Sequence, residues 1–240
     1  MTVETYFQLL QRRRDNPSDE STCASLNALR IAIAEAMPDS YVEVYSGTMV
    51  NLTRPTADMI HAGDIAHALS RIPRFNGHSH IPYTVARHTI LVVDILKSWD
   101  ANPELLLMAW LHDAPEAYLG DIPTPLKRLF QPQFDILEAR FLIAIYDAIL
   151  PKGEDMEFGH PDDYACLKHA DRLALLIERM VLKYPGEPTD HDWWFPASMY
   201  EEAKKLEHLC PCHAFTPEQD RVEFLRGLDS AVKAVLSQPK

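Results

Sequence analysis

The amino-acid sequence predicts a mostly α-helical bundle with a small β element near the N-terminus. Apolar residues recur at helical spacing along almost the whole chain, and only 8 of the 240 residues are glycine. The segment from Tyr41 to Asn51 differs, because it alternates apolar and polar residues around Ser46-Gly47, as a short hairpin does. No repeat or low-complexity tract divides the chain, so we expect a single domain over residues 1–240.

The expected helices are defined by apolar stripes and by prolines. A first helix carries Leu26, Ile31, Ile33 and Met37 and is expected to end at Pro38. Further helices are expected over residues 56–72, 83–99, 103–112 and 132–150, from residue 161 onward, and over residues 197–209 and 217–236. The segments 120–125 (GDIPTP) and 184–196 are expected to be loops.

One helix is expected to end close to two polar residues. Asn102-Pro103 provides an N-cap and a first-turn proline for a helix that reaches His112-Asp113. Pro115 would clash with a carbonyl group of the preceding turn if that helix continued unbroken. We therefore expect a kink or a helix end beside His112 and Asp113.

The composition excludes several classes of protein. With 47% hydrophobic and 24% charged residues, the chain resembles ordinary globular proteins, and no apolar run reaches the ~18–20 residues of a membrane span. The net charge of -12 argues against binding a nucleic-acid polymer, which requires many lysines and arginines. No secretory signal is visible, so we expect a cytoplasmic protein, in the host cytoplasm if it is phage-encoded. The four cysteines are expected to be free thiols: Cys23, Cys166, Cys210 and Cys212.

Polar residues occupy positions where helical stripes should be apolar. His88, the doublet His112-Asp113, and Asp171 each lie in an otherwise apolar stretch. Burying a lone carboxylate costs several kcal/mol unless it is paired or binds a cation. Imidazole nitrogens and carboxylate oxygens are ligands of divalent metals. The four residues together therefore predict one bound metal ion as cofactor, which is Zn, Co, Mn or Mg.

Each of these residues also has a simpler interpretation. A single buried histidine is more often a hydrogen-bonded core residue. Asp113 is suited to cap a helix that restarts at Pro115, and Asp171 is suited to pair with Arg172 or Lys168.

Glu116 follows the doublet at a spacing that places it on the same helical face if the helix continues. A carboxylate there is well placed as a general base for a metal-activated water. The alternative is a glutamate on the helix surface.

The order of these residues is similar to a known family signature. His88, His112-Asp113 and Asp171 resemble the H…HD…D pattern that names the HD phosphohydrolase superfamily. Residues 112–127 (HDAPEAYLGDIPTPLK) resemble the bacterial HD-family 5′-deoxynucleotidases and the phage-encoded HD triphosphohydrolases of dATP and other deoxynucleoside triphosphates. The likeness covers about residues 41–180 and implies an HD-domain helical bundle; about residues 193–240 form an expected C-terminal helical extension outside it.

The resemblance implies roles for the site residues. His88, His112, Asp113 and Asp171 would bind the metal, and Glu116 would activate water as a catalytic residue. The substrate side is implied to hold four further residues: Arg74 as catalytic phosphate clamp, Phe75 near the sugar or base, Asp121 at a sugar hydroxyl, and Lys127 at a phosphate. Two departures are that Phe75 stands where the deoxynucleotidases usually have Trp, and that His169 stands where relatives often carry an uncharged polar residue.

The function that the resemblance implies is a metal-dependent nucleotide phosphohydrolase. Release of triphosphate from a deoxynucleoside triphosphate such as dATP is the first expectation, and release of phosphate from a deoxynucleoside monophosphate is the alternative. A catalytically idle, nucleotide-binding regulatory module and a hydrolase of cyclic or signalling nucleotides are further alternatives. The expected partners are a small nucleotide and a second copy of the chain, with no nucleic-acid polymer and no membrane.

Some polar residues stay outside this prediction. A second metal site is not favoured at His208, Cys210, Cys212 and His213, since the spacing is too tight for a usual zinc knuckle. His78 and His80 lie between Arg74 and His88 and are expected either to touch substrate or to be exposed. Residues 193–195 (WWF) are expected to form an aromatic plug, with a lid or subunit contact as alternatives.

Overall fold

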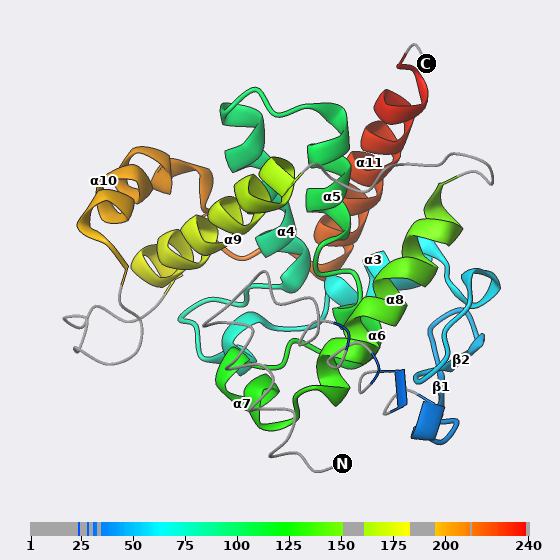
Figure 1. Ribbon diagram of the computed structural model, residues 1–240. Helices are drawn as coiled ribbons and strands as arrows, with labels where there is room; N and C mark the ends of the chain where they lie inside the picture. Colours follow the sequence, from blue (N-terminus) through cyan, green and yellow to red (C-terminus); the bar gives the residue numbers. More distant parts are fainter. Residues whose placement is uncertain are drawn as a thin grey trace.

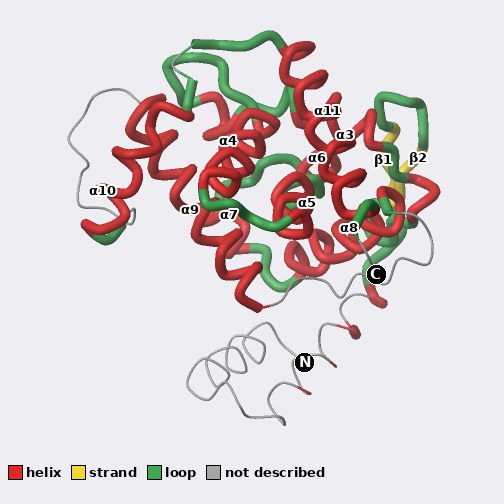
Figure 2. Tube along the Cα trace, turned by 90° about the horizontal axis from the view of Figure 1, so that it is seen from above, coloured by secondary structure: helices red, strands yellow, loops and turns green. Residues whose placement is uncertain are grey.

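The computed structural model describes residues 35–150, 161–182, 195–211 and 213–238, together with positions 24, 28, 31 and 32. The described chain is mostly α-helical with one small antiparallel hairpin, as the sequence predicts (Figures 1 and 2). The hairpin strands and short 3-10 helices are β1 (Tyr41–Glu43), β2 (Met49–Asn51), η1 (Ala57–Met59), η2 (Arg74–Gly77) and η3 (Glu207–Leu209). The α-helices are α3 (Ala62–Leu69), α4 (Val85–Ser98), α5 (Pro103–Leu111), α6 (Glu116–Leu119), α7 (Thr124–Leu129), α8 (Gln133–Ile149), α9 (Pro161–Leu182), α10 (Ala197–Leu206) and α11 (Pro217–Leu236).

Helix α4 lies at the centre of the bundle. It packs against α9, α5 and α11, and Figure 1 shows α9 and α5 on either side of it. Its sequence is apolar on almost every face, and even its polar residues Arg87, His88 and Thr89 are buried. A helix that is surrounded in this way can present different side chains to several neighbours at once.

Helix ends follow the sequence signals closely where caps are present. The Asn102 side chain accepts a hydrogen bond from the backbone N–H of Leu105, and Pro103 opens α5, as predicted. At α11, Thr216 and Gln219 form a reciprocal capping box, and the helix has the predicted bounds. Hydrogen bonds from local side chains therefore determine where α5 and α11 begin.

The predicted break near the His-Asp doublet is confirmed. Helix α5 ends at Leu111, residues 112–115 form turns, and α6 begins at Glu116. Because Pro115 has no N–H to donate into the preceding turn, α5 cannot continue as one helix. His112 and Asp113 consequently project from a helix end.

Two expectations about the chain were wrong in part. The expected helix over 56–72 is interrupted, because Ile60 is extended between η1 and α3 and buries its side chain in the core. The expected loop over 120–125 ends early, since α7 begins at Thr124 and accommodates Pro125 in its first turn, where no N–H is needed.

Other expectations lie wholly or partly outside the described residues. Leu26 and Ile33 of the first expected helix lie outside, while the described positions from 24 to Ala36 are helical and Ile31 is exposed. The expected loop over 184–196 is described only at Phe195 and Pro196. None of the helices in the described ranges is long and apolar enough to cross a membrane.

The C-terminal helix α11 packs onto α5 and α3 and also touches α4 (Figure 1). Between α4 and α11, the buried Arg87 donates to Asp220 at 2.5 Å and to Glu223 at 2.6 Å. Asp220 also accepts a hydrogen bond from Thr84 at 2.7 Å. The expected C-terminal extension is thus tied to the centre of the bundle by buried polar contacts.

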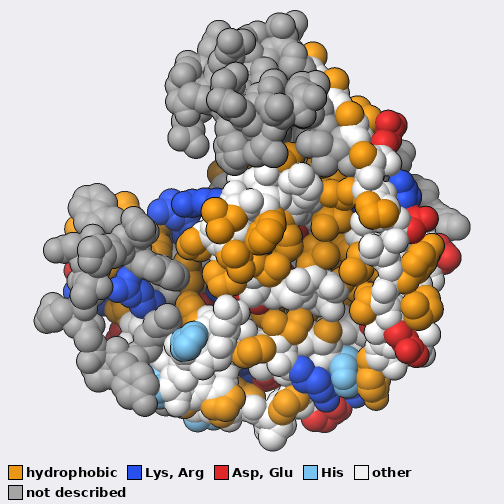
Figure 3. Space-filling view, turned by 90° about the horizontal axis from the view of Figure 1, so that it is seen from below, with side chains coloured by type: hydrophobic (Ala, Val, Ile, Leu, Met, Phe, Trp, Pro, Cys, Tyr) orange, Lys and Arg blue, Asp and Glu red, His pale blue; other side chains and the backbone are white. Residues whose placement is uncertain are grey.

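Hydrophobic side chains gather on the face that Figure 3 shows from below. Leu126, Leu129 and Phe130, in and directly after α7, are among the large exposed hydrophobic residues. Exposed apolar patches are common where proteins contact other molecules. The expected homo-oligomer stays a prediction.

Candidate metal centre and its cavity

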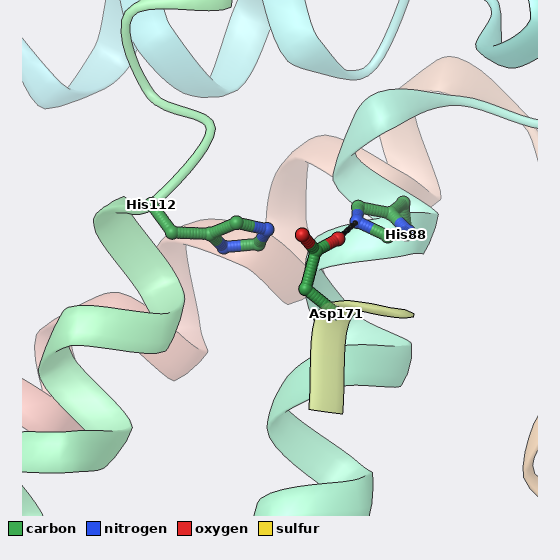
Figure 4. Close-up of side chains that lie close together, drawn as sticks. All are labelled: His88, His112 and Asp171. Carbon is green, nitrogen blue, oxygen red and sulfur yellow. Dashed lines mark hydrogen bonds and ion pairs between the residues drawn. The ribbon is translucent and has the colours of Figure 1, made fainter. Parts of the chain in front are cut away.

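Three of the predicted ligands converge from three helices. His88 comes from α4, His112 from the C-terminal end of α5, and Asp171 from α9 (Figure 4). One ligand atom from each of the three lies within 4.8 Å of the other two. This buried group can hold a metal ion, and it is the one such group in the ranges that the structure describes.

The two imidazole rings are oriented by hydrogen bonds on their far sides. The Nδ1 atom of His88 donates to Oε1 of Glu178 at 2.7 Å, and Nδ1 of His112 donates to the carbonyl oxygen of Ala109 at 2.6 Å. In His112, Nε2 is then the nitrogen that carries the lone pair, and in His88, Nε2 points at Asp171 and would carry the lone pair once a cation replaces its proton. Among the described residues, buried His112 Nε2 has no hydrogen-bond partner. The pair of rings therefore has the orientation that metal-ligating histidines adopt.

Asp113 lies beside the same two nitrogens. Its Oδ2 atom is 3.2 Å from Nε2 of His112 and 3.5 Å from Nε2 of His88. It does not belong to the mutually close group of three. Burial acts to raise the pKa of Asp113, but the charges of His112, His88 and Arg74 hold it well below its usual value. An ionised carboxylate is thus held next to both rings.

The centre stabilises positive charge. Burial and the charge of Arg74 act to lower the pKa of His88, but the charge of Glu178 and the hydrogen bonds with Asp171 and Glu178 raise it to about 10. Asp171 itself is 3.1 Å from Nε2 of His88, whereas its contact with Lys168 is a long 3.9 Å. The simpler interpretation of Asp171 as a partner of Lys168 therefore describes a weaker contact than the one with His88.

A cavity of about 890 Å³ opens onto this centre. It is lined by His112, Asp113 and Asp171, while His88 is fully buried behind them. The cavity has the size of a small-molecule site. All the other predicted site residues also line it: Arg74, Phe75, Glu116, Asp121 and Lys127.

Glu116 is buried in the wall of the cavity. Its Oε1 atom lies 3.5 Å from the ammonium group of Lys127, and its Oε2 atom has no hydrogen-bond partner among the described residues. Burial and the charges of Asp113 and Asp121 raise the pKa of Glu116 to about 9, against the opposing charges of Lys127 and Arg74. The interpretation as a surface glutamate is wrong, because the break at Pro115 turns this residue inward.

Arg74 reaches the cavity from a constrained loop. Its guanidinium lies 3.5 Å from Asp121 and 3.3 Å from Glu178, and its buried Nε has no partner in the described part of the chain. The next residue, Phe75, has a positive φ of 56°, and its ring centroid is 5.5 Å from the guanidinium. Such a backbone conformation costs about 1–3 kcal/mol and is often found at functional sites.

Further cations lie around the cavity. Lys127 contacts Glu138 at 2.7 Å in addition to Glu116. Exposed Arg128, Lys168 and Arg172 line the same cavity. The cavity lining also contains an equal number of carboxylates, so a bound divalent cation would leave the lining with a net positive charge that suits an anion.

Other predicted residues lie away from the centre. His169 pairs with Glu202 at 3.0 Å and stacks on Trp99, so its proximity in sequence to Asp171 is incidental. His80 donates to the carbonyl of Leu182, and neither His78 nor His80 lines the cavity.

The aromatic and cysteine-rich segments are described only in part. Phe195 lines the cavity near Arg172, whereas Trp193 and Trp194 lie outside the described residues. Cys210 is buried and His208 and His213 are exposed, but Cys212 is not described. Cys166 is a free thiol, as predicted, and Cys210 forms no disulfide bond with a described residue.

Glu178 is a site residue that the sequence analysis did not assign. Its side chain is fully buried and contacts both His88 and Arg74. A signal was present, because Glu178 lies on the same face of α9 as Asp171 and Leu175. An acidic residue on that apolar stripe requires a partner, but its partners lie 90 and 104 residues away along the chain.

Comparison with known proteins gives relatives without an assigned function. The chain is 34% identical over 195 residues to the uncharacterized protein YfdR of Escherichia coli K12, an alignment that covers 79% of this chain and 97% of that protein. It is 31% identical over 163 residues to an uncharacterized protein of Rhodobacter capsulatus, with 63% of this chain and 82% of that protein covered. No family model matches the chain.

Proposed function

The chain belongs to the family of the uncharacterized protein YfdR, and we propose that it is a metal-dependent nucleotide phosphohydrolase of the HD type. One observation carries the proposal. His88, His112 and Asp171 converge at the wall of a cavity in which Glu116 Oε2, Arg74 Nε and His112 Nε2 have no hydrogen-bond partner among the described residues. Buried polar atoms without partners are costly to maintain, and a metal ion with an anionic substrate would satisfy them.

The residues fit a divalent cation. His88, His112 and Asp171 would hold it, with Asp113 as the fourth ligand, since its carboxylate lies against both imidazole nitrogens. Two imidazoles and two carboxylates suit Zn, Mn, Co or Mg. When bound, the cation supplies Lewis-acid polarisation of a phosphoryl oxygen and lowers the pKa of a water.

Glu116 is the residue that we assign to water activation. Its Oε1 atom contacts Lys127, whereas its buried Oε2 has no hydrogen-bond partner among the described residues and is the oxygen that we assign to accept the proton of an attacking water. Burial and the charges of Asp113 and Asp121 raise the pKa of Glu116, so this carboxyl is protonated near neutral pH when no cation is present, and a bound cation would favour the ionised form that acts as a base. General bases of this kind contribute roughly 10²- to 10⁴-fold to a rate.

Arg74 is the residue that we assign to the phosphoryl group. Its guanidinium is positioned by Asp121 and Glu178 and keeps a donor at Nε for an anion. A fixed cation that meets charge developing on the phosphoryl oxygens stabilises the transition state without reorganisation. Phe75 next to it is then placed beside the sugar or the base.

The remaining cations favour a deoxynucleoside triphosphate over a monophosphate. One phosphate group needs only the metal and Arg74, whereas Lys127, Arg128, Lys168 and Arg172 offer positive charge along a longer phosphate tail. The proposed reaction is therefore hydrolysis of a triphosphate, dATP or a similar nucleotide, to deoxynucleoside and triphosphate. Hydrolysis of a deoxynucleoside monophosphate is the alternative.

Product analysis tests this proposal. Purified protein is incubated with the deoxynucleoside mono- and triphosphates plus Mn²⁺, Co²⁺, Zn²⁺ or Mg²⁺, and phosphate, pyrophosphate and triphosphate are separated chromatographically. We expect triphosphate and deoxynucleoside, with product formation abolished by a chelator. Inorganic phosphate from monophosphates alone would select the alternative reaction. No product with any pair of metal and nucleotide would contradict the enzymatic proposal and favour a nucleotide-binding regulatory module.

Glu116→Gln is the first variant to compare. We expect turnover to fall about 10²- to 10⁴-fold while metal binding, measured by calorimetry, is retained. The matched control is Glu202→Gln, which removes a carboxylate that pairs with His169 away from the cavity and should leave the rate unchanged. A full rate in Glu116→Gln would remove Glu116 from the mechanism.

A further inference from the structure

We propose that Glu178 is a positioning residue that links the metal centre to the anion-binding arginine. The inference rests on the proposed function, because it assigns Glu178 a role toward the metal ligand His88 and the phosphate clamp Arg74. Glu178 lies on α9, the helix that carries Asp171, and its side chain is fully buried. Its carboxylate is therefore out of contact with solvent.

The two carboxylate oxygens of Glu178 serve two different partners. Oε1 accepts a hydrogen bond from Nδ1 of His88 at 2.7 Å, and Oε2 accepts one from Nη2 of Arg74 at 3.3 Å. Neither oxygen belongs to the group of mutually close ligand atoms formed by His88, His112 and Asp171. Glu178 thus acts through its two neighbours.

The contact with His88 determines which ring nitrogen is available to a cation. With Nδ1 of His88 donating to Glu178, Nε2 points at Asp171 and the centre, where its lone pair would be available to a cation that replaces the Nε2 proton. A carboxylate behind a metal-bound histidine fixes the tautomer and the ring orientation and raises the basicity of the ligand. His112 obtains the same orientation from a neutral carbonyl, so His88 is the ligand with the anionic support.

The contact with Arg74 determines where the guanidinium points. Arg74 stands between Glu178 and Asp121, and the two contacts of 3.3 and 3.5 Å hold its Nη atoms while Nε has no partner among the described residues. The negative charge of Glu178 also compensates the buried guanidinium, which would otherwise be unfavourable. Without Glu178, Arg74 would lose one of its two anchors on the cavity wall.

The dual role requires a carboxylate. An amide has one acceptor oxygen and one donor nitrogen, so a glutamine at position 178 can accept from His88 or from Arg74, and its NH₂ group then faces the N–H of the other partner. Glu178→Gln keeps the shape of the side chain and removes both the charge and the second acceptor. One substitution should therefore weaken metal binding and anion binding together.

Direct binding measurements separate this role from a purely structural one. The full-length protein is titrated with Mn²⁺ by calorimetry, and the manganese-loaded protein is then titrated with tripolyphosphate. For Glu178→Gln we expect Mn²⁺ affinity to fall about 10- to 100-fold. We also expect a lower affinity for tripolyphosphate, and a Co²⁺ visible spectrum shifted from that of the wild type.

Two control variants make the result specific. Asp220→Asn also neutralises a buried carboxylate that pairs with an arginine next to α4, but it lies on the α11 side. It should lower the thermal midpoint and leave Mn²⁺ affinity unchanged. Arg74→Gln should weaken tripolyphosphate binding and leave Mn²⁺ affinity within about twofold. In the double variant with Glu178→Gln the two effects on tripolyphosphate should be less than additive, because both changes disrupt one contact.

The possible results are distinct. If the wild type binds neither Mn²⁺ nor tripolyphosphate, the proposed function fails before Glu178 is considered. If the wild type binds both and Glu178→Gln binds Mn²⁺ within twofold of it, the positioning role is refuted while the proposed function stands. Equal losses of Mn²⁺ affinity in Glu178→Gln and Asp220→Asn would likewise refute it, since a general loss of stability would explain both.

Discussion

Two neighbouring residues of α4 face different surroundings. Arg87 points toward α11, where Asp220, Glu223 and the ring of Phe215 surround its guanidinium. His88 points toward α9 and the cavity, where Glu178, Asp171 and Asp113 surround its imidazole. Both side chains are buried, and both are contacted by more than one carboxylate.

The two surroundings differ in how completely their polar atoms are satisfied. On the α11 side, both oxygens of Asp220 accept hydrogen bonds, from Arg87 and Thr84. On the cavity side, His112 Nε2, Glu116 Oε2 and Arg74 Nε have no hydrogen-bond partner in the described chain. A closed network holds helices together, whereas an open one is complete only with a ligand. The same helix thus supports structure through Arg87 and the candidate chemistry through His88.

The largest effect is expected from a substitution in the open network on the cavity side. In Asp171→Asn we expect Mn²⁺ affinity and turnover to fall at least about a thousandfold, since removing a ligand exceeds the 10- to 100-fold cost of an outer-shell change. The unfolding free energy of the metal-free protein should change by no more than about 1 kcal/mol, because Asp171 is 28% exposed and its pairing is screened by water. Calorimetry and urea denaturation measure the two quantities. A loss of several kcal/mol in stability would mean that this network is structural as well.

The next largest effect is expected from a substitution in the closed network on the α11 side. Asp220→Asn leaves Arg87 buried with an incomplete partner, and we expect the unfolding free energy to fall by about 3–5 kcal/mol. The matched control on the same helix is Asp229→Asn, whose exposed pair with Lys233 should contribute less than about 0.5 kcal/mol. Urea denaturation of both variants checks this. Similar stabilities for the two would contradict the assignment of the α11 contact as a main structural link.

The sequence predicted the architecture and much of the candidate site because those features depend on local patterns. Asn102-Pro103 and Pro115 set the ends of α5, which is why the position of His112 was predictable. The helix over 56–72 was wrong because apolar spacing does not show whether a helix is continuous. The side chain of Ile60 is buried, as its place on the apolar stripe predicts, but its backbone is extended and not helical.

The contacts that complete the site could not be predicted in the same way. Glu178 was visible as an acidic residue on an apolar stripe, but its partners come from α4 and from the loop of Arg74. Phe75, next to Arg74, has a left-handed backbone, a conformation that its sequence does not favour. The partners of Glu178 and the backbone conformation of Phe75 both depend on tertiary packing. Lys127 shows the same limit, since its contacts with Glu116 and Glu138 join two segments across the cavity.

The smallest effect is expected from a substitution that tests how closely α11 packs against α5. A Cβ atom at Gly227 of α11 would lie 2.0 Å from the ring of Trp110, which is buried and packs edge-on against Phe224. In an uncrowded helix, Gly→Ala stabilises by about 0.4–1 kcal/mol, but crowding in a packed core costs about 1–3 kcal/mol. We expect Gly227→Ala to be destabilising by about 1–3 kcal/mol in urea denaturation. Gly63→Ala in α3 is the control, because a Cβ there meets no atom within 4 Å, and it should be neutral or stabilising. Stabilisation by both would show that α11 can move away from α5 at little cost. The ion pair of Arg87 and Asp220 would then be the main attachment of α11 to the bundle.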